Sequence, residues 1–522
     1  MHDRIRPRTL TRRSFVRLAA GTSAGLAGAH FLPRPARSAA APTTVTFCLG
    51  ADVASIQPHA DTAGQSRNVV MHIMETLVTR DDDLNIVPLL ATSWRRINPT
   101  TTEFKLRENV KFHNGRPLTG EDVKFSLERV MDKNLKLLAR SFLATVDHVD
   151  VVNPTTVRVV TDQPDPGLLN RLAYQSQVII SAETFKSQGA EVFTRKPTGT
   201  GPYSFVEWVK DDHLTMDANP TYWGGRPKID RLIYKPILEA ATRLAALKTG
   251  AVDLIANVEP EQVPDIQKDP NLRISRVRST RIMFVGMNSF RKPFTDVRVR
   301  QAMNYAVDVD AIIKDLMSGF AHRLSNIAGP GYFGYDPSLK PYPYDPAKAK
   351  ALLAQAGYPN GFEVTLNSPK GRYLMDAEVS QAVSGYLAKV GVRVKVEVME
   401  WGNFIARVYD ASNADNRFSM FLIGTGSPIL DIDSTLGGYL DSKRRGLYYN
   451  TPALDALIAK GQTTMEPETR IKVYSEIQKN VLEAAPWIFL FNPEDVFGLN
   501  KRLTGWKARA DETVYLAKAA VQ

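Results

Sequence analysis

The chain has 522 residues, of which 43% are hydrophobic and 23% are charged. The composition is ordinary for a globular protein, but the chain is too long for a single hydrophobic core, so we expect two or three domains. No apolar run approaches the roughly 18–20 residues of a membrane-spanning helix, which excludes a transmembrane segment. Of the formal net charge of +11, residues 1–41 carry +7, and the weakly basic remainder excludes a nucleic-acid partner.

Residues 1–41 have the three parts of an export signal: a basic region, a weakly apolar segment and small residues at the end. Arg12 and Arg13, followed by Ser, Phe and Val, resemble the twin-arginine signal. We therefore expect the twin-arginine translocase to export the chain, with cleavage after Ala40 or Ala41, and a soluble periplasmic product. The alternative is a disordered basic tail.

Cys48 is the only cysteine, and it lies in a strand-like apolar run over residues 45–51. A single cysteine excludes a disulfide within the chain, and the apolar neighbours indicate a thiol in the core. The residues before it are too large for a lipidation site, so we expect no lipid anchor.

The next segments alternate between short strands and capped helices. Phe104 and Leu106 alternate with polar residues, as in an edge-exposed strand, and Thr119 with Asp122 begins a helix. Further strands and helices are expected at residues 69–77 (helix), 147–162 (two strands), 239–250 (helix) and 252–255 (strand). The loop over residues 196–203 contains two glycines but no Walker-type Lys and Ser, which favours a structural turn over an anion cradle.

Residues 281–310 and 487–491 contain two strands that can link two lobes. Residues 282–287 form a short apolar run, and Thr295 or Asp296 can cap the helix that follows. Two such strands crossing between the same lobes would form a hinge with a ligand cleft between the lobes. Two ordinary core strands of one domain would give the same pattern.

The later half alternates more regularly. Helices are predicted from Asp345 to Gly357 and over residues 376–390, with strands over residues 362–366 and 392–398. This alternation favours an α/β lobe in which loops at strand ends hold the ligand.

No pattern of catalytic or metal-binding residues stands out. The eight histidines are scattered, with no HExxH pair, so we expect neither a metal site nor a cofactor. An SxxK at residues 289–292 and a KTG at residues 248–250 occur in the reverse of the order found in penicillin-recognising enzymes. We therefore expect no catalytic residues and no enzyme activity.

Six blocks in order resemble the family 5 extracellular solute-binding proteins, the peptide- and nickel-type periplasmic receptors of ABC importers. The blocks are LATSW with LRENVKFHNGRPLTGEDVKFSLERV, PTGTGPY, NPTYWGGRPKIDRLIYKPI, PFTDVRVRQAMNYAVD, YDPAKAKALLAQAGYPNGF and AKVGVRVKVEVMEWGNF. The resemblance implies an α/β fold of the type II periplasmic binding protein kind, with two lobes joined by two crossover strands. It implies a discontinuous domain I (42–80, 198–287 and 488–522), an inserted domain II (81–197) and a domain III (288–487).

The resemblance also implies a binding site. Arg372 is the counterpart of the arginine that pairs with the ligand carboxylate, although a solvated loop residue is the alternative. Ser427 stands near the aspartate that holds the ligand's amino group, Gly424 near a tryptophan, and Asp431 could substitute for that aspartate or cap the next helix. Gly426 and Asn288 are expected to line the same cleft.

These observations predict a monomeric receptor that captures a small peptide or peptide-like ligand and delivers it to an ABC permease with cytoplasmic ATPases. Longer peptides, modified peptides such as glutathione, and opine-like compounds all remain open as ligands. The alternatives are a nickel-chelate or haem receptor of the same fold, and a periplasmic enzyme or chaperone.

Overall fold

The computed structural model describes residues 42–522 except residues 54, 61–63 and 427–428. The predicted export signal and Ser427 therefore lie outside the described residues. Among the helices of the described part, none is both long and apolar enough to cross a membrane.

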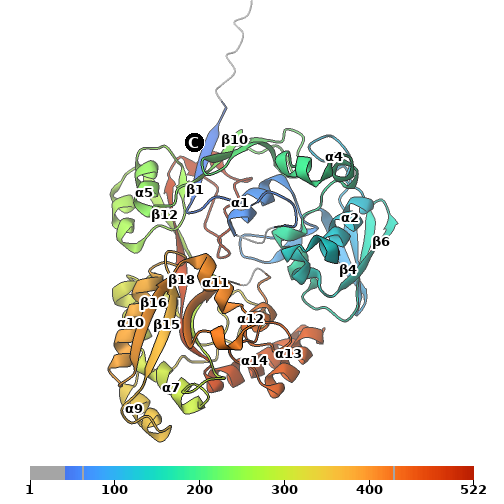
Figure 1. The fold of residues 1–522 in the computed structure, drawn as a ribbon. Helices are drawn as coiled ribbons and strands as arrows, with labels where there is room; N and C mark the ends of the chain where they lie inside the picture. The colour runs from blue at the N-terminus through green and yellow to red at the C-terminus, as the bar shows by residue number, and fades with distance from the viewer. Residues whose placement is uncertain (1–41, 54, 61–63, 427–428) are drawn as a thin grey trace, which may run out of the picture. The chain divides into compact units, whose positions relative to one another are not determined.

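One large mixed sheet runs through the structure in the order β16-β15-β17-β13-β18-β11-β1-β10-β9-β8, with β12 and β14 also paired to β18 (Figure 1). Its strands are β1 (Thr44–Leu49), β8 (Tyr203–Val209), β9 (His213–Ala218), β10 (Arg231–Pro236), β11 (Leu254–Ile255), β12 (Leu272–Arg278), β13 (Ile282–Met287), β14 (Ala321–Arg323), β15 (Glu363–Pro369), β16 (Arg393–Met399), β17 (Met420–Thr425) and β18 (Trp487–Asn500). The first half of β18 pairs with β13, and its second half pairs with β11 and β12. This strand therefore joins the two parts of the sheet, and β13 has the bounds predicted from its apolar run.

A separate four-stranded sheet has the order β4-β5-β7-β6. Its strands are β4 (Ala91–Asn98), β5 (Thr101–Leu106), β6 (Val146–Asn153) and β7 (Thr156–Thr161), and two small ribbons consist of β2 (Val78–Arg80) with β3 (Ile86–Pro88) and β19 (Leu503–Thr504) with β20 (Ala520–Val521). The prediction of an edge-exposed strand around Phe104 was wrong, because β5 pairs on both sides and Phe104 is fully buried.

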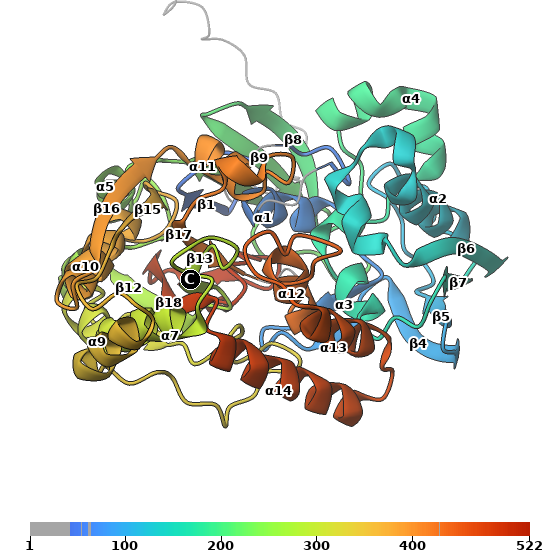
Figure 2. The same cartoon turned by 60° about the horizontal axis from the view of Figure 1, so that its bottom comes forward.

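The α-helices cover these sheets. They are α1 (Gly64–Ile73), α2 (Gly120–Met131), α3 (Leu168–Leu172), α4 (Ala182–Arg195), α5 (Ala240–Lys248), α6 (Val263–Lys268), α7 (Val297–Ala306), α8 (Val309–Ala311), α9 (Pro346–Gln355), α10 (Asp376–Ala388), α11 (Trp401–Val408), α12 (Ile432–Tyr439), α13 (Pro452–Thr463) and α14 (Pro467–Ala484). Figure 2 shows α13 and α14 side by side. The predicted starts are confirmed, because Asp296 caps α7 and the Asp122 carboxylate accepts the Thr119 N–H at 2.9 Å at the start of α2.

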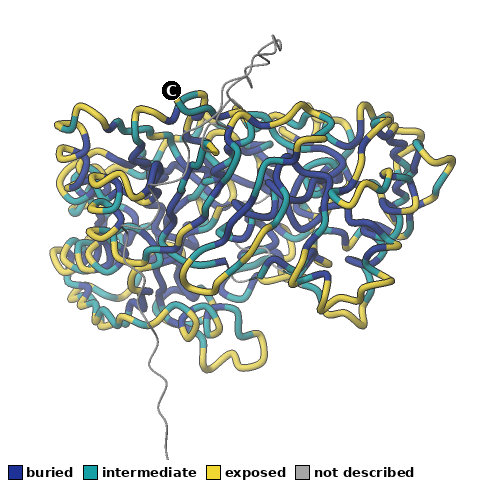
Figure 3. Tube along the Cα trace, turned by 90° about the horizontal axis from the view of Figure 1, so that it is seen from above, coloured by how far each residue is buried: buried dark blue, intermediate teal, exposed yellow. Residues whose placement is uncertain are grey.

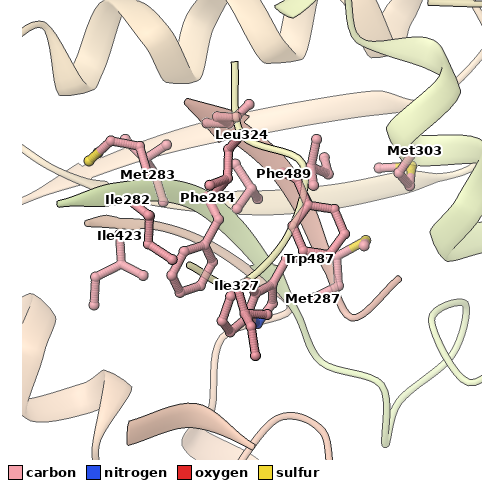
Figure 4. Close-up of a cluster of buried hydrophobic side chains, with 14 of the residues drawn as sticks. Ile282, Met283, Phe284, Met287, Met303, Leu324, Ile327, Ile423, Trp487 and Phe489 are labelled. Atoms are coloured by element: carbon pink, nitrogen blue, oxygen red, sulfur yellow. The ribbon is translucent and has the colours of Figure 1, made fainter. Parts of the chain in front are cut away.

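The largest core surrounds β13 and the first half of β18. Phe284 of β13 stacks on Trp487 of β18, with ring centroids 3.8 Å apart and planes 13° apart (Figure 4). Two further cores lie around β1 and beneath the four-stranded sheet, and the buried backbone runs through the interior in Figure 3. Cys48 of β1 is fully buried in a fourth, smaller core, and burial raises the pKa of its thiol to about 11.

The Gly-rich loop over residues 196–203 packs against the end of α1. A Cβ at Gly199 would lie 2.0 Å from the Ile73 carbonyl oxygen, so only glycine allows this approach. Beside it, the buried Glu75 carboxylate accepts hydrogen bonds from Thr200, Tyr222 and Trp223 at 2.7–2.9 Å. Burial raises the pKa of Glu75 to about 7. The loop is therefore held by close packing and by an acid that has only neutral donors.

Candidate functional site

Arg372 lies in the loop between β15 and α10, and the Asp376 carboxylate organises this loop. That carboxylate accepts the backbone N–H groups of Gly371, Arg372 and Tyr373 at 3.0–3.1 Å. Gly371 has a φ of 75°, a left-handed conformation that suits glycine. The backbone that carries Arg372 is thus fixed before any ligand arrives.

The Arg372 guanidinium lies 5.0 Å from the ring centroid of Tyr373 and 5.2 Å from that of Trp401. Within the described part of the chain, no carboxylate oxygen lies within the 4.0 Å limit of an ion pair from it. Burial, and then the nearby Arg281, lower the pKa of Arg372. Arg372 is therefore a cation that stacks on aromatic rings and has no carboxylate partner of its own.

Arg281, which directly precedes β13, lies on the same aromatic ring and is paired. Its guanidinium is 5.4 Å from the Tyr373 centroid, and its Nε donates to the Glu512 carboxylate at 3.0 Å. Burial opposes ionisation of both groups, but their attraction raises the pKa of Arg281 and lowers that of Glu512. Two guanidinium groups therefore lie beside Tyr373, and the Glu512 carboxylate neutralises that of Arg281.

Tyr373 also explains the glycine in β17. A Cβ at Gly424 would lie 2.4 Å from Met283 Sδ and 2.8 Å from the Tyr373 ring, and the Tyr373 hydroxyl donates to the Gly424 carbonyl at 2.8 Å. The tryptophan that the resemblance places near this position has no room here. The Tyr373 ring occupies the space over Gly424 instead.

The structure brings some of the predicted site residues together and separates others. Gly426 lies beside Arg281, whose Cα would be 3.8 Å from a Cβ on that glycine. Asn288 lies beyond the opposite end of β13, roughly 20 Å away along the strand. Its side-chain amide donates to the Phe418 carbonyl at 3.3 Å and its oxygen accepts the Phe290 N–H. The structure thus does not place Asn288 with Arg372 and Gly426.

Asp431 is engaged within the protein. Its carboxylate is fully buried and accepts from the two terminal nitrogens of Arg470 at 2.7 and 3.1 Å, and it caps α12 through the Asp433 N–H at 2.9 Å. A carboxylate with these partners holds a helix and an arginine in place. The capping alternative predicted for this residue is the one that the geometry shows.

Arg281 and Glu512 were not among the predicted site residues, because no local pattern marks them. The two residues are 231 positions apart, and each is an ordinary charged residue in its own segment. Two surface hollows, of about 500 and 280 Å³, are lined by residues of 116–187 and of 247–272 with Asn500, and neither includes Arg372, Arg281 or Glu512. No group of three or more His, Cys, Asp or Glu side chains among the described residues could hold a metal ion.

A model of the bacterial extracellular solute-binding proteins, family 5 (middle) matches residues 85–446. The chain is 30% identical over 473 residues to the glutathione-binding protein GsiB of Pectobacterium atrosepticum, covering 89% of this chain and 91% of GsiB. The structure is similar to that of the periplasmic binding protein DppA from Helicobacter pylori in complex with peptide STSA, with a TM-score of 0.79, 28% identity and coverage of 92% and 98% of the two chains. It is also similar to the binding protein AgaA in complex with agropinic acid from A. tumefacien R10, with a TM-score of 0.77, 29% identity and coverage of 92% and 99%.

Proposed function

Because the chain belongs to the family 5 bacterial extracellular solute-binding proteins, a family of non-enzymatic receptors, we propose that it captures a peptide-like solute at the site around Arg372 for an ABC importer. The observation that carries this proposal is the Arg372 guanidinium, which lies over Tyr373 and Trp401 and has no carboxylate at ion-pair distance among the described residues. A free carboxylate of the solute is the partner that completes it.

The chemistry of the guanidinium supports a carboxylate ligand. Its planar fork donates two parallel hydrogen bonds to the two oxygens of a carboxylate, a geometry that an ammonium group cannot provide. The aromatic rings exclude water from the flanks of Arg372, which strengthens the attraction. Peptides, glutathione and opine acids all carry such a carboxylate, so the ligands named for the relatives agree with this chemistry.

We also propose the biological setting that the sequence predicts. Residues 1–41 direct export through the twin-arginine translocase, the mature protein acts as a soluble periplasmic monomer, and an ABC permease with cytoplasmic ATPases receives the solute. Domain I consists of residues 42–80, 198–287 and 488–522, domain II of residues 81–197, and domain III of residues 288–487. Ligand binding stabilises a closed arrangement of the two lobes.

Native mass spectrometry of the protein purified from the periplasm tests the function. We expect a retained solute of peptide-like mass that is released on denaturation, and isothermal titration with glutathione and Ala-Gln then gives the affinities of the emptied protein. Saturable binding of either compound supports the proposal. A retained solute of another class, together with no heat from either compound, contradicts it.

A further inference from the structure

Residues 509–513 carry ionic contacts next to the Arg281 site. Arg509 pairs with the Asp511 carboxylate at 2.9 Å, and both side chains are only about one-tenth exposed, at 11% and 12%. The next residue, Glu512, is the partner of Arg281. These two ion pairs use both carboxylates of the segment.

Arg67 of α1 approaches the same segment, and no ion pair joins it to a carboxylate among the residues that the structure describes. Its Nη2 donates to the backbone carbonyl of Asp511, and its Nε is buried without a hydrogen-bond partner. A Cβ on Gly64 would lie 3.7 Å from Arg67 Nη2 and 4.0 Å from Glu512 Oε2. Arg67 and Glu512 thus both lie near the start of α1, and the charges of Arg281, Arg372 and Arg67 all lower the pKa of Glu512.

Arg80 is a third arginine that, within the described part of the chain, has no carboxylate at ion-pair distance. It donates to the carbonyls of Leu84 and Ile429, both at 2.8 Å, and to the side-chain oxygen of Asn170 at 3.0 Å. Burial lowers its pKa to about 10, and the charges of Asp511 and Arg509 are the next influences on it. Arg80 is therefore part of the same electrostatic environment.

Among the residues that the structure describes, the cationic groups around residues 509–513 outnumber the carboxylates paired with them. Among the described residues, Arg67, Arg80 and Arg372 have no carboxylate within 4.0 Å, while Arg281 and Arg509 take Glu512 and Asp511. Asp495 lies in the same region, and burial, and then the neighbouring Glu512, raise its pKa well above its ordinary value. Arg67, Arg80 and Arg372 are half-buried, and a cation that is partly removed from water without a counterion is costly, so an anionic ligand gains from entering.

We propose that the site selects a ligand of net negative charge, with Arg372 taking one carboxylate and Arg67 taking a second anionic group. This inference rests on the proposed function and restricts the ligands to those with a net negative charge. A zwitterionic dipeptide with an apolar side chain would offer Arg67 no anionic group. A small peptide or peptide-like acid with two carboxylates offers one anionic group to each of these two arginines.

Isothermal titration with ligands matched in shape tests this preference. Ala-Glu and Ala-Gln differ only in replacing a carboxylate by an amide, and glutarate and glutaramate give the same comparison without a peptide. We expect the more acidic member of each pair to bind at least about tenfold more tightly, and the preference to shrink in high salt.

The variant Arg67→Met tests the assigned residue. We expect the Ala-Glu to Ala-Gln affinity ratio to fall several-fold while Ala-Gln binding stays within about twofold of wild type. The control Arg298→Met removes the same charge from an arginine that is 46% exposed and should leave the ratio unchanged. Circular dichroism confirms folding of both variants, and the wild-type comparison decides the preference if Arg67→Met does not fold.

The outcomes separate the two proposals. Equal binding within the pairs, or tighter binding of the amides, overturns the charge preference while leaving a peptide receptor. Binding of glutarate over glutaramate without any peptide binding supports the preference and contradicts the peptide receptor. No binding of any of the four compounds overturns the preference.

Discussion

Arg470 and Arg372 are two arginines with different partners within the protein. Arg470 has a side chain that is 3% exposed, and it has a fully buried carboxylate, Asp431, at 2.7 Å. It also donates to the Tyr474 hydroxyl at 2.6 Å and to the Gly461 carbonyl at 2.8 Å. Arg372 has aromatic rings on its flanks and, among the described residues, no carboxylate within ion-pair distance.

The difference separates a structural arginine from a binding one. Where a guanidinium is needed to hold the fold, the sequence supplies a carboxylate and further acceptors, because a buried unpaired charge destabilises the protein. At Arg372 the aromatic faces stabilise the cation only in part. A ligand carboxylate supplies the counterion of Arg372.

Removing the buried ion pair between Asp431 and Arg470 should have the largest effect on the free energy of unfolding. Asp431→Asn keeps a side-chain acceptor for the α12 cap but leaves Arg470 buried without a counterion, so the free energy of unfolding should fall by about 3–5 kcal/mol. Urea unfolding followed by circular dichroism measures this. The control Asp296→Asn changes a cap whose partner, Arg298, is 46% exposed, and should cost at most about 1 kcal/mol. Equal losses in the two variants would remove the contrast between buried and exposed pairs.

Breaking the binding arginine should leave the fold intact. Arg372→Met keeps much of the apolar contact with Tyr373 and Trp401 but removes the charge, so affinity for a carboxylate ligand should fall by about 30- to 150-fold, or about 2–3 kcal/mol. The unfolding midpoint should not decrease, since no ion pair is lost. Titration calorimetry and thermal unfolding measure the two effects, and Arg393→Met, in an exposed ion pair with Glu363, is the control. Unchanged affinity would exclude Arg372 from the site.

Filling the space between Gly424 and the Tyr373 ring should have a smaller effect on stability. In Gly424→Ala, the new methyl group collides with Met283 and Tyr373, which should cost about 1–3 kcal/mol. Adding Tyr373→Leu should relieve part of this cost, so a double-mutant cycle by urea unfolding should give a favourable coupling. Additive losses would show that Tyr373 does not fill the space over Gly424.

Glu75 is the acidic counterpart of Arg372, a buried carboxyl group whose hydrogen-bond donors among the described residues are all neutral, and its effect is a change of stability with pH. Because its folded pKa of about 7 exceeds the ordinary value of 4.5, its contribution to stability is complete below pH 4.5 and is lost as the pH rises through 7. This loss is at most about 1.4 kcal/mol per pH unit. Glu75→Gln should flatten the dependence between about pH 5 and pH 8 in thermal unfolding. An unchanged slope, as expected for the exposed control Glu191→Gln, would mean that Glu75 does not titrate in this range.

Short-range patterns predicted much of the fold. The apolar run at residues 282–287 is β13, and the caps at Asp296 and Thr119 begin α7 and α2, because each signal lies within a few neighbouring residues. The position of β5 could not be predicted, since alternation shows which face is buried but not how many neighbours a strand has. The family resemblance, not periodicity, supplied Arg372.

The rest of the site depends on contacts between distant segments. Glu512 meets Arg281 across 231 residues, and Asp431 meets Arg470 across 39 residues. Sequence alone therefore left Asp431 as either a ligand group or a cap, and gave no sign that Arg281 and Arg372 share one aromatic ring. Asn288 was expected to line the same cleft as Gly426, but only the register of β13 with β17 shows that the two residues lie at opposite ends of the strand.

The single cysteine has a practical consequence. Cys48 is fully buried with a thiol pKa of about 11, so at neutral pH it is protonated and inaccessible to maleimide dyes. A cysteine introduced beside Arg372 would accordingly be the one site that such a dye labels in the folded protein. A fluorescent reporter built in this way would allow solute libraries to be screened for ligands of this protein.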